Sequence, residues 1–521
     1  MKKYYLLSIV TFLLFSLLLG AIIGNAQDDD FAFYAYNNNP FNDWDPSVEF
    51  SNGIVSLNNI YETLLRYDPL EDKIIKVLAT DYTTSSDGLT WTFYLRKGVK
   101  FHDGTELNAD AVKFSIDRTM RINRGAAFIW EAVDKINVVD NYTVEFRLKY
   151  PTPLDLICSS GYAAFIMSPT TVKSRPDNWL SEGNEAGSGP YKLERYQQER
   201  GEVVLTWFED YWGGWEGNHF KKVVIKGVTE VATRRLLIES GEADFTWKLL
   251  YEDIASLQDN ENVNIPIGLS FLTYKIALNT QKEPLNNKLV RQALAYACPY
   301  QDIVSYCFEG YARQSKGPIP YGLWGHGEEL FQYEYNLDKA KQLLEEAGYP
   351  NGGFKFLITY EASDEAERKM AELFKASLAK LNIDLEIRGM PWESQWALAR
   401  DNNPEKRQDI WIEVWWPDVV SPHSWLYTCF YSEEKPYFNL SYYKNKEYDY
   451  LVDKAWREAG IDRNRSAQTY IEAQKILVED CPEIFVCDMK NVFYLNKTFK
   501  GYKDNPGYPQ TVFFYDTYRE K

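Results

Sequence analysis

Residues 89–104 read LTWTFYLRKGVKFHDG, and this stretch is the most informative one for the fold of the 521-residue chain. Trp91, Phe93 and Leu95 alternate with Thr92, Tyr94 and Arg96, a pattern typical of a strand with one buried face. Residues 144–148 (VEFRL) show the same alternation. We therefore predict half-buried strands at 91–95 and 144–148.

The second half of the chain alternates helix and strand signals. Apolar residues recur at helical spacing over 337–347, where Gly348 and Pro350 end the helix. A strand is predicted at 354–360, a helix at 366–381 and another strand at 383–387. This order predicts an α/β lobe. Because one hydrophobic core stops growing at roughly 250–300 residues, we expect at least two lobes, joined by chain crossings rather than by a linker.

Composition excludes several classes of protein. Lys and Arg total 57 against 75 Asp and Glu, a net charge of −18 that repels nucleic acid and anionic lipid. Four histidines leave little room for a histidine-built metal centre, so no metal or cofactor is predicted. Aromatic residues reach 16%, which suits a ligand-binding cleft, although most of these rings must fill the core.

The amino terminus has the layout of a secretory signal. Lys2 and Lys3 precede an apolar run over 4–23, and residues 24–26 (GNA) offer small side chains before a cleavage point at Gln27. The run is also long enough for an uncleaved anchor. We predict a signal peptide or an N-terminal anchor at 1–26 and a mature protein outside the cytoplasm, periplasmic or at the cell surface.

Export leaves the state of the cysteines open. The six cysteines fit no zinc motif and are too few for a disulfide scaffold. They could pair in an oxidising compartment, and buried free thiols are an equally good interpretation.

Seven segments, in order along nearly the whole mature chain, resemble the extracellular solute-binding proteins of the peptide/nickel class, family 5, which feed ABC importers. These segments are 59–67 (NIYETLLRY), 89–104 with 107–112 (LNADAV), 187–193 (GSGPYKL), 239–244 (ESGEAD), 278–280 (LNT), 290–297 (VRQALAYA) and 339–348 (KAKQLLEEAG). Segment 187–193 lacks the Lys-Ser/Thr of a phosphate-binding loop and is a turn. Each motif alone is weak evidence, and the resemblance rests on all seven occurring in the order expected for the family.

The resemblance implies a two-lobed α/β fold of the periplasmic-binding-protein type II, with an extra subdomain in the first lobe and hinge strands between the lobes. The predicted domains are lobe I at 27–67, 185–275 and 490–521, its extra subdomain at 68–184, and lobe II at 276–489. The hinge strands are expected near 271–278 and 487–493. Such a protein closes on its ligand, and the loaded form engages ABC permease subunits. We expect a monomer.

The segment 415–418 (WWPD) resembles the one at which peptide-binding members pair an aspartate with the peptide's α-amino group. This match implies that Asp418 takes that role and that Trp415 lines the pocket. A carboxylate dehydrated by indoles is costly unless it meets a cation or hydroxyl donors. Without the resemblance, a surface or strand-end acid would be the better interpretation of Asp418.

Further ligand-binding candidates come from the same resemblance. Trp392 matches a second family tryptophan that faces the cleft, and Trp416 departs from the small or apolar residue common at its position. In lobe I, residues 49–51 (Glu49, Phe50, Ser51) fall where peptide binders meet the ligand backbone. His423 alone does not predict a nickel site, because nickel takes several nitrogen or oxygen ligands.

A departure from the family bears on the ligand. Where dipeptide-binding members use an arginine to grip the peptide's C-terminal carboxylate, this chain has Glu361, which would repel it. A free dipeptide is therefore disfavoured unless Arg368 or Arg400 substitutes. Longer peptides and oligosaccharides stay open, and the aromatic content leads us to favour an oligosaccharide slightly over a peptide.

Two alternatives come from outside transport. An exported glycoside hydrolase would need two carboxylates about 5–10 Å apart, and 75 acids guarantee such pairs without discriminating. No G-x-S-x-G or H-E-x-x-H signature occurs, so no catalytic residue is predicted and we expect a protein that is not an enzyme. A peptide sensor on the same scaffold is the other alternative.

Overall fold

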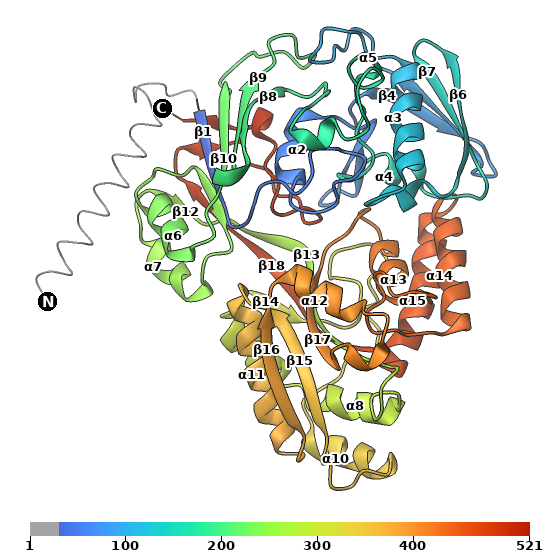
Figure 1. The fold of residues 1–521 in the computed structure, drawn as a ribbon, viewed down its shortest axis with the longest axis vertical. Coiled ribbons are helices and arrows are strands. Elements are labelled where there is room, and N and C mark those ends of the chain that lie inside the picture. The colour runs from blue at the N-terminus through green and yellow to red at the C-terminus, as the bar shows by residue number, and fades with distance from the viewer. Residues whose placement is uncertain (1–30, 521) are drawn as a thin grey trace, which may run out of the picture.

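A computed structural model describes residues 31–520, and the predicted signal at 1–26 lies outside them. The described chain forms an upper and a lower lobe along its longest axis (Figure 1). We call them lobe I and lobe II, with the limits proposed above. A twelve-stranded sheet extends through both lobes in the order β16-β15-β17-β13-β18-β11-β1-β10-β9-β8, with β12 and β14 also paired to β18.

The strands of this sheet have the following bounds: β1 Phe31–Tyr36, β8 Tyr191–Gln197, β9 Glu202–Trp207, β10 Lys222–Gly227, β11 Phe245–Trp247, β12 Val263–Asn264, β13 Ile267–Leu278, β14 Ala312–Gln314, β15 Lys355–Glu361, β16 Asp384–Met390, β17 Ile410–Trp415 and β18 Glu483–Asn496.

In lobe I, β1 is the central strand and runs parallel to both of its neighbours, β10 and β11. Beyond β10 the sheet continues antiparallel through β9 and β8. The helices α6 (Val231–Glu239) and α7 (Ile254–Gln258) belong to this lobe and bury Ile238, Ile254 and Leu257 in a small second core with Ala35 of β1. Helix α2 (Ile54–Ile60) packs on β8 and is almost entirely buried.

The extra subdomain is an antiparallel sheet of four strands, in the order β4-β5-β7-β6, with helix α3 packed on β6 and β7. The predicted strands at 91–95 and 144–148 are confirmed as β5 (Thr90–Leu95) and β7 (Thr143–Leu148). Trp91 and Phe93 are buried as the alternation requires. The other bounds are β4 Ala79–Thr84, β6 Val133–Asp140, α3 Ala109–Ile122, α4 Leu154–Ile157 and α5 Pro169–Val172, with the hairpin β2 Leu65–Asp68 and β3 Lys73–Lys76 beside them.

Lobe II confirms the predicted order of helix, strand, helix and strand. Helix α10 (Leu337–Glu346) is followed by Gly348, whose φ of 89° lies in the left-handed region that glycine favours. Then come β15, α11 (Glu365–Ala379) and β16. Strand β15 is the centre of this part, parallel to both β16 and β17. The remaining helices are α8 Lys288–Tyr296, α9 Tyr300–Asp302, α12 Trp392–Ala399, α13 His423–Phe430, α14 Lys446–Ala459 and α15 Arg463–Asp480.

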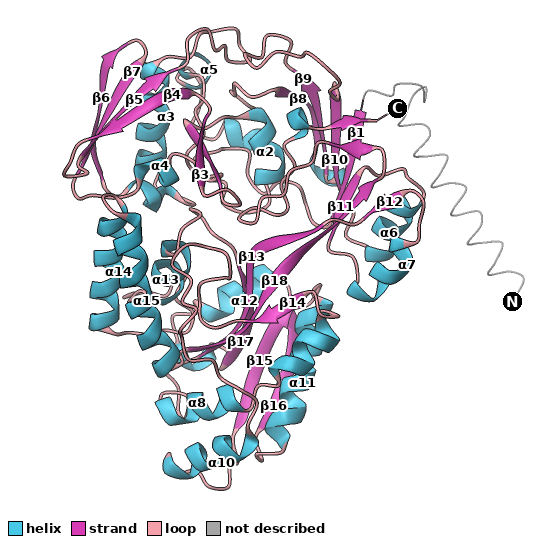
Figure 2. Ribbon diagram, turned by 180° about the vertical axis from the view of Figure 1, so that it is seen from behind, coloured by secondary structure: helices cyan, strands magenta, loops and turns pink. Residues whose placement is uncertain are grey.

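Strands β13 and β18 cross from one lobe to the other (Figure 2). The end of β13 pairs with β17 in lobe II, whereas residues 493–495 of β18 pair with β11 in lobe I. The register between the two strands shifts between Leu269 and Thr273. This irregularity lies between the lobes, where hinge strands are expected to bend.

All six cysteines are buried free thiols, so the interpretation without disulfides is the one that the structure supports. Among the described residues, no helix combines the length and apolar character needed to span a bilayer.

Candidate functional site

A cavity of about 670 Å³ lies between the two lobes. Lobe I contributes residues near the end of β1, the loop at 50–52 and the segment after β11. Lobe II contributes α12, β17, the end of β15 and the start of α11. A volume of this size is typical of sites for small molecules, and such sites often occur between domains.

The cavity brings together seven of the eight residues that the sequence singles out. They are Asp418, Trp415, Trp416, Trp392, Glu361, Phe50 and Ser51. The eighth, Glu49, is not among the lining residues. The lining residues come from both lobes, so a solute held there contacts both.

Asp418 follows β17, and its carboxylate is the most unusual group in the cavity. The residue is only 8% exposed, and its Oδ2 atom finds no hydrogen-bond donor among the described residues. Burial raises the pKa of Asp418 to about 7. Its backbone carbonyl, by contrast, accepts hydrogen bonds from Ser160 Oγ at 2.7 Å and from Tyr508 Oη at 2.8 Å. The backbone is therefore anchored to lobe I while the carboxylate stays unpaired.

Indole rings build the lobe II wall beside this carboxylate. Trp392 and Trp396 lie one helical turn apart on α12 and stack at 4.9 Å. Trp396 meets Trp411 of β17 edge to face at 5.9 Å. Trp415 donates its indole N–H to the carbonyl of Ser424 at 2.8 Å. Trp396 and Trp411 were not among the predicted site residues. The Trp-x-x-x-Trp spacing of Trp392 and Trp396 could have indicated Trp396, because residues four apart lie on one face of a helix.

A buried lysine supports this wall from the hinge sheet. Lys275 of β13 places its Nζ 3.3 Å from Glu413 of β17 and 3.1 Å from Glu483 of β18. The same ammonium lies 5.4 Å from the ring centroid of Trp415. Burial raises the pKa of Glu483 to about 7. The cluster thus joins three neighbouring strands directly beside Trp415.

The acids at the start of α11 form another polar part of the lining. Glu361, at the end of β15, accepts a hydrogen bond from Ser363 Oγ at 2.8 Å, while its Oε2 atom is buried without a partner among residues 31–520. Burial raises the pKa of Glu361. Glu367 is buried and accepts the backbone N–H of Glu361 at 2.6 Å. This part of the lining therefore contains two neighbouring carboxyl groups, and one oxygen of Glu361 is left for a ligand.

Neither arginine proposed as a substitute for the family's arginine lines the cavity. Arg368 pairs with Glu365 and with Glu372 on its own helix, and Arg400 stacks on Trp396 at 5.0 Å. Four other cationic residues line the cavity instead: Arg234 of α6, Lys248 after β11, Lys369 of α11 and Lys490 of β18. None of these four was among the predicted site residues.

Glu49 lies behind the lobe I wall, in a loop that we call the strap (residues 43–53). Its carboxylate accepts three backbone N–H groups, from Asp43 at 2.8 Å, Ser51 at 2.6 Å and Gly53 at 3.0 Å. The carboxylate is therefore occupied in closing the loop that presents Phe50 and Ser51 to the cavity. This position gives Glu49 a structural role, and its predicted contact with the ligand stays a prediction.

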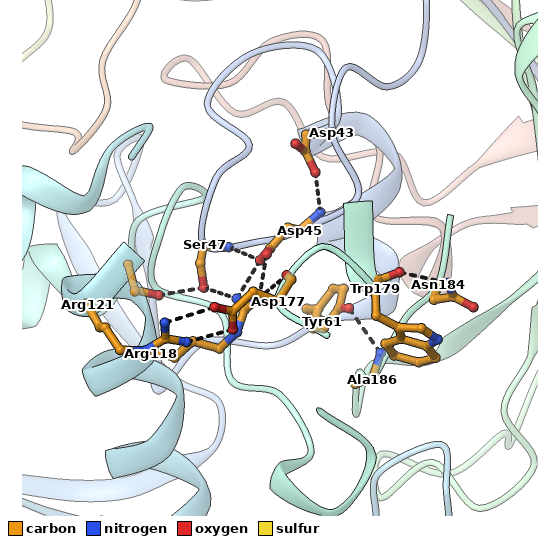
Figure 3. Close-up of polar contacts among 11 residues, drawn as sticks. Asp43, Asp45, Ser47, Tyr61, Arg118, Arg121, Asp177, Trp179, Asn184 and Ala186 are labelled. Atoms are coloured by element: carbon orange, nitrogen blue, oxygen red, sulfur yellow. Dashed lines mark hydrogen bonds and ion pairs between the residues drawn. The ribbon is translucent and has the colours of Figure 1, made fainter. Parts of the chain in front are cut away.

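Arg118 of α3 braces the strap from the extra subdomain (Figure 3). Its two terminal nitrogens donate to the carboxylate of Asp45 at 2.7 and 2.6 Å, and Nη1 also donates to Ser47 Oγ at 2.8 Å. Arg118 and Asp45 are both nearly fully buried. Such a two-pronged pair fixes geometry as well as charge. The extra subdomain thus holds the loop that forms part of the lobe I wall.

His423 is packed between aromatic rings. The imidazole stacks on Trp456 at 4.1 Å and on Tyr427 at 4.6 Å. Burial lowers the pKa of His423 to about 3, so the ring is neutral at physiological pH. Its contacts are those of a core residue.

Comparison with known proteins identifies the family of this chain. Residues 73–437 match the family model described as bacterial extracellular solute-binding proteins, family 5 Middle. The probable D,D-dipeptide-binding periplasmic protein DdpA of Escherichia coli (strain K12) is 30% identical over 472 residues, 89% of each chain. Heme-binding protein A of Haemophilus influenzae is 28% identical and covers 88% of this chain and 87% of its own.

Among solved structures, the periplasmic binding protein DppA of Helicobacter pylori in complex with peptide STSA matches with a TM-score of 0.83 at 28% identity, over 94% of this chain and 98% of its own. The two-lobed fold inferred from the sequence is thereby confirmed. The family model covers more than half of the chain, and the relatives match it over nearly their whole length. The chain therefore belongs to the bacterial extracellular solute-binding proteins of family 5.

Proposed function

We propose that this protein is an extracytoplasmic receptor of an ABC importer, which closes its lobes around a peptide or a peptide-like solute with a free amino group. The solute leaves chemically unaltered and passes to the permease. Similarity to DdpA, named for D,D-dipeptides, and to DppA, solved with peptide STSA, supports this class of ligand. The receptor acts as a monomer outside the cytoplasm.

The observation that carries the proposal is the unpaired carboxylate of Asp418. Its Oδ2 atom is buried in the cavity lining without a donor among the described residues. A buried carboxylate without a partner is unfavourable, and an ammonium group offers it three donors and the opposite charge. A neutral hydroxyl offers one donor and no charge. The carboxylate therefore favours an amine-bearing solute over the oligosaccharide that the composition alone favoured slightly.

We assign the other end of such a ligand to Lys248 and Lys369, two of the four cationic residues that line the cavity. Lys248 and Lys369 line the cavity and supply the positive charge that Glu361 does not. Lys369 already lies 3.4 Å from Glu252, so a ligand carboxylate would compete with that acid. This arrangement suits a peptide whose termini are both charged.

An oligosaccharide is the second candidate, and the stacked pair Trp392 and Trp396 is the observation that favours it. Indole faces provide flat apolar surface for sugar rings. A receptor for either ligand releases it chemically intact, whereas a glycoside hydrolase would cleave its substrate.

A titration of intrinsic tryptophan fluorescence tests the proposal with trialanine, tetra-alanine, N-acetyl-trialanine and cellotriose. We expect saturable changes with the free peptides, weaker binding of the acetylated peptide, and intact ligand on mass spectrometry of the complex. If only cellotriose gave a saturable change, the ligand class would be an oligosaccharide and not a peptide. Accumulation of cleaved product beyond one equivalent would contradict a receptor.

A further inference from the structure

The lobes also touch outside the cavity lining. The turn between α14 and α15 of lobe II lies against the extra subdomain of lobe I, near α4 (Figure 1). Arg463, the first residue of α15, donates to Asp155 Oδ2 of α4 at 3.0 Å and lies 3.4 Å from Asp72 Oδ1. None of these three residues lines the cavity. The contact therefore joins the lobes without touching the solute.

The surfaces at this contact fit closely. A Cβ atom on Gly460 would lie 2.4 Å from the backbone nitrogen of Thr152, so a larger side chain has no room there. One on Gly88 would approach Ile461 to 3.2 Å. Arg457 of α14 lies over the ring of Tyr150 at 4.9 Å. Lobe II is thus docked on the subdomain by packing as well as by charge.

The charges at this contact depend on the lobes being together. Asp155 is 8% exposed, and its other oxygen accepts the N–H of Leu156 at 2.9 Å. The guanidinium of Arg463 lies over the ring of Trp324 of lobe II, 5.7 Å from the ring centroid. An opening motion that moves the turn between α14 and α15 away from the extra subdomain would break the pair of Asp155 and Arg463, and both side chains would then be hydrated instead. The pair therefore contributes to the closed arrangement and contributes nothing to an open one.

We propose that Arg463 is a closure-positioning residue, and that its pairing with Asp155 and Asp72 makes the extra subdomain a latch for the closed receptor. The latch rests on the closure proposed above and acts independently of which solute is bound. Its free energy adds to that of the solute in shifting the lobes from open to closed. Because the apparent affinity scales with the closed fraction, loss of the latch weakens all solutes by the same factor.

Double electron–electron resonance measures the latch directly, without a ligand. Spin labels at Val139→Cys of β6 and Tyr450→Cys of α14 sit on exposed positions, one on each side of the contact, while the native thiols are buried. In Arg463→Gln we expect the ratio of closed to open populations to fall about three- to tenfold. Gly460→Ala should open the lobes as well, by steric conflict and with all charges in place.

The matched control is Arg465→Gln. Arg465 is 69% exposed and pairs with Glu458 inside lobe II, so its loss should leave the distances unchanged. Salt provides a second readout: raising NaCl from 50 to 500 mM should open the wild type but have little further effect on Arg463→Gln.

Unchanged distance distributions in both Arg463→Gln and Gly460→Ala would overturn the latch. Trialanine titrations of the same variants separate this failure from a failure of the receptor proposal. If the distances stay fixed while trialanine still binds, the latch is wrong and the receptor stands. If the distances shift but no peptide binds, the latch stands and the assigned ligand class is wrong.

Discussion

Glu49 and Asp418 are both buried acids near the interlobe cavity, yet their surroundings differ completely. Glu49 is 3% exposed and accepts three backbone N–H groups of its own loop. Asp418 is 8% exposed, and its Oδ2 atom has no donor among the described residues. A carboxylate whose oxygens are occupied by the chain stabilises the fold. One that is buried and left unpaired destabilises it unless a ligand arrives.

The same contrast separates the two walls of the cavity. The lobe I strap is closed by Glu49 and braced by Arg118, so its polar groups are already committed to the protein. The lobe II wall offers indole faces together with the free oxygens of Asp418 and Glu361. The strap therefore provides shape, whereas Asp418 and Glu361 of the lobe II wall provide hydrogen-bond acceptors without partners among the described residues.

Removing the brace of the strap should have the largest effect. Arg118→Met leaves Asp45 buried without its cation, and we expect the free energy of unfolding to fall by about 3–5 kcal/mol. Urea denaturation followed by circular dichroism measures this. Arg121→Met is the matched control, because Arg121 pairs with Asp177 at the surface and should change stability by less than about 1 kcal/mol. Equal effects of the two variants would refute the bracing role.

Glu49→Gln should destabilise less, by about 1–3 kcal/mol, because one of its oxygens is replaced by a donor facing backbone N–H groups. The denaturation midpoint measures the loss. Trialanine affinity of the folded protein should change much less than stability does. If affinity collapses while stability is unchanged, Glu49 is a ligand contact after all and the contrast with Asp418 fails.

The pH dependence of stability should report Asp418. Its pKa is about 7 in the folded protein because of burial, against about 3.9 in an unfolded chain, so the folded state binds the extra proton between these values. The resulting stabilisation is present at low pH and is lost as pH rises through 7. Between pH 5.5 and 8 the wild type should lose about 1–2 kcal/mol relative to Asp418→Asn.

Parallel pH profiles of the wild type and Asp418→Asn would contradict this assignment. Glu483 and Asp504 also have pKa values raised to about 7 by burial, and the comparison with the variant cancels their contributions.

The smallest effect concerns the indole wall. Trp392→Phe keeps an aromatic ring on α12 but reduces its area, and we expect trialanine to bind about three- to tenfold more weakly. Fluorescence titration measures it. Trp207→Phe is the control, because Trp207 of β9 packs against Trp215 outside the cavity lining. An equal loss in both variants would mean that the effect does not arise in the cavity.

Much of the fold could be predicted from local sequence patterns. The alternation around Trp91 and Phe93 gave a strand because burial on one face of a sheet requires period two. The family motifs were informative because each one marks a turn or a packing position, and their order follows the chain. The motif at 415–418 likewise put Asp418 and Trp415 into the cavity lining.

The rest depends on contacts between distant segments. Arg118 contacts Asp45 although 73 positions separate them in the sequence, and Lys248 and Lys369 line one cavity although they belong to different lobes. The family resemblance located the loop of Glu49, but it does not tell which way a side chain in that loop points, and Glu49 is not among the lining residues. Nothing in its neighbours along the sequence indicates that three backbone N–H groups converge on its carboxylate.

We propose that Asp418 receives the amino group of the solute, and isothermal titration calorimetry can test this pairing. Trialanine and N-acetyl-trialanine are each titrated into the wild type and into Asp418→Asn. We expect the wild type to bind the free amine about tenfold or more tightly than the acetylated peptide, and the variant to lose this preference while remaining folded. Equal affinities of the wild type for the two peptides, or a preference that survives in the variant, would contradict it.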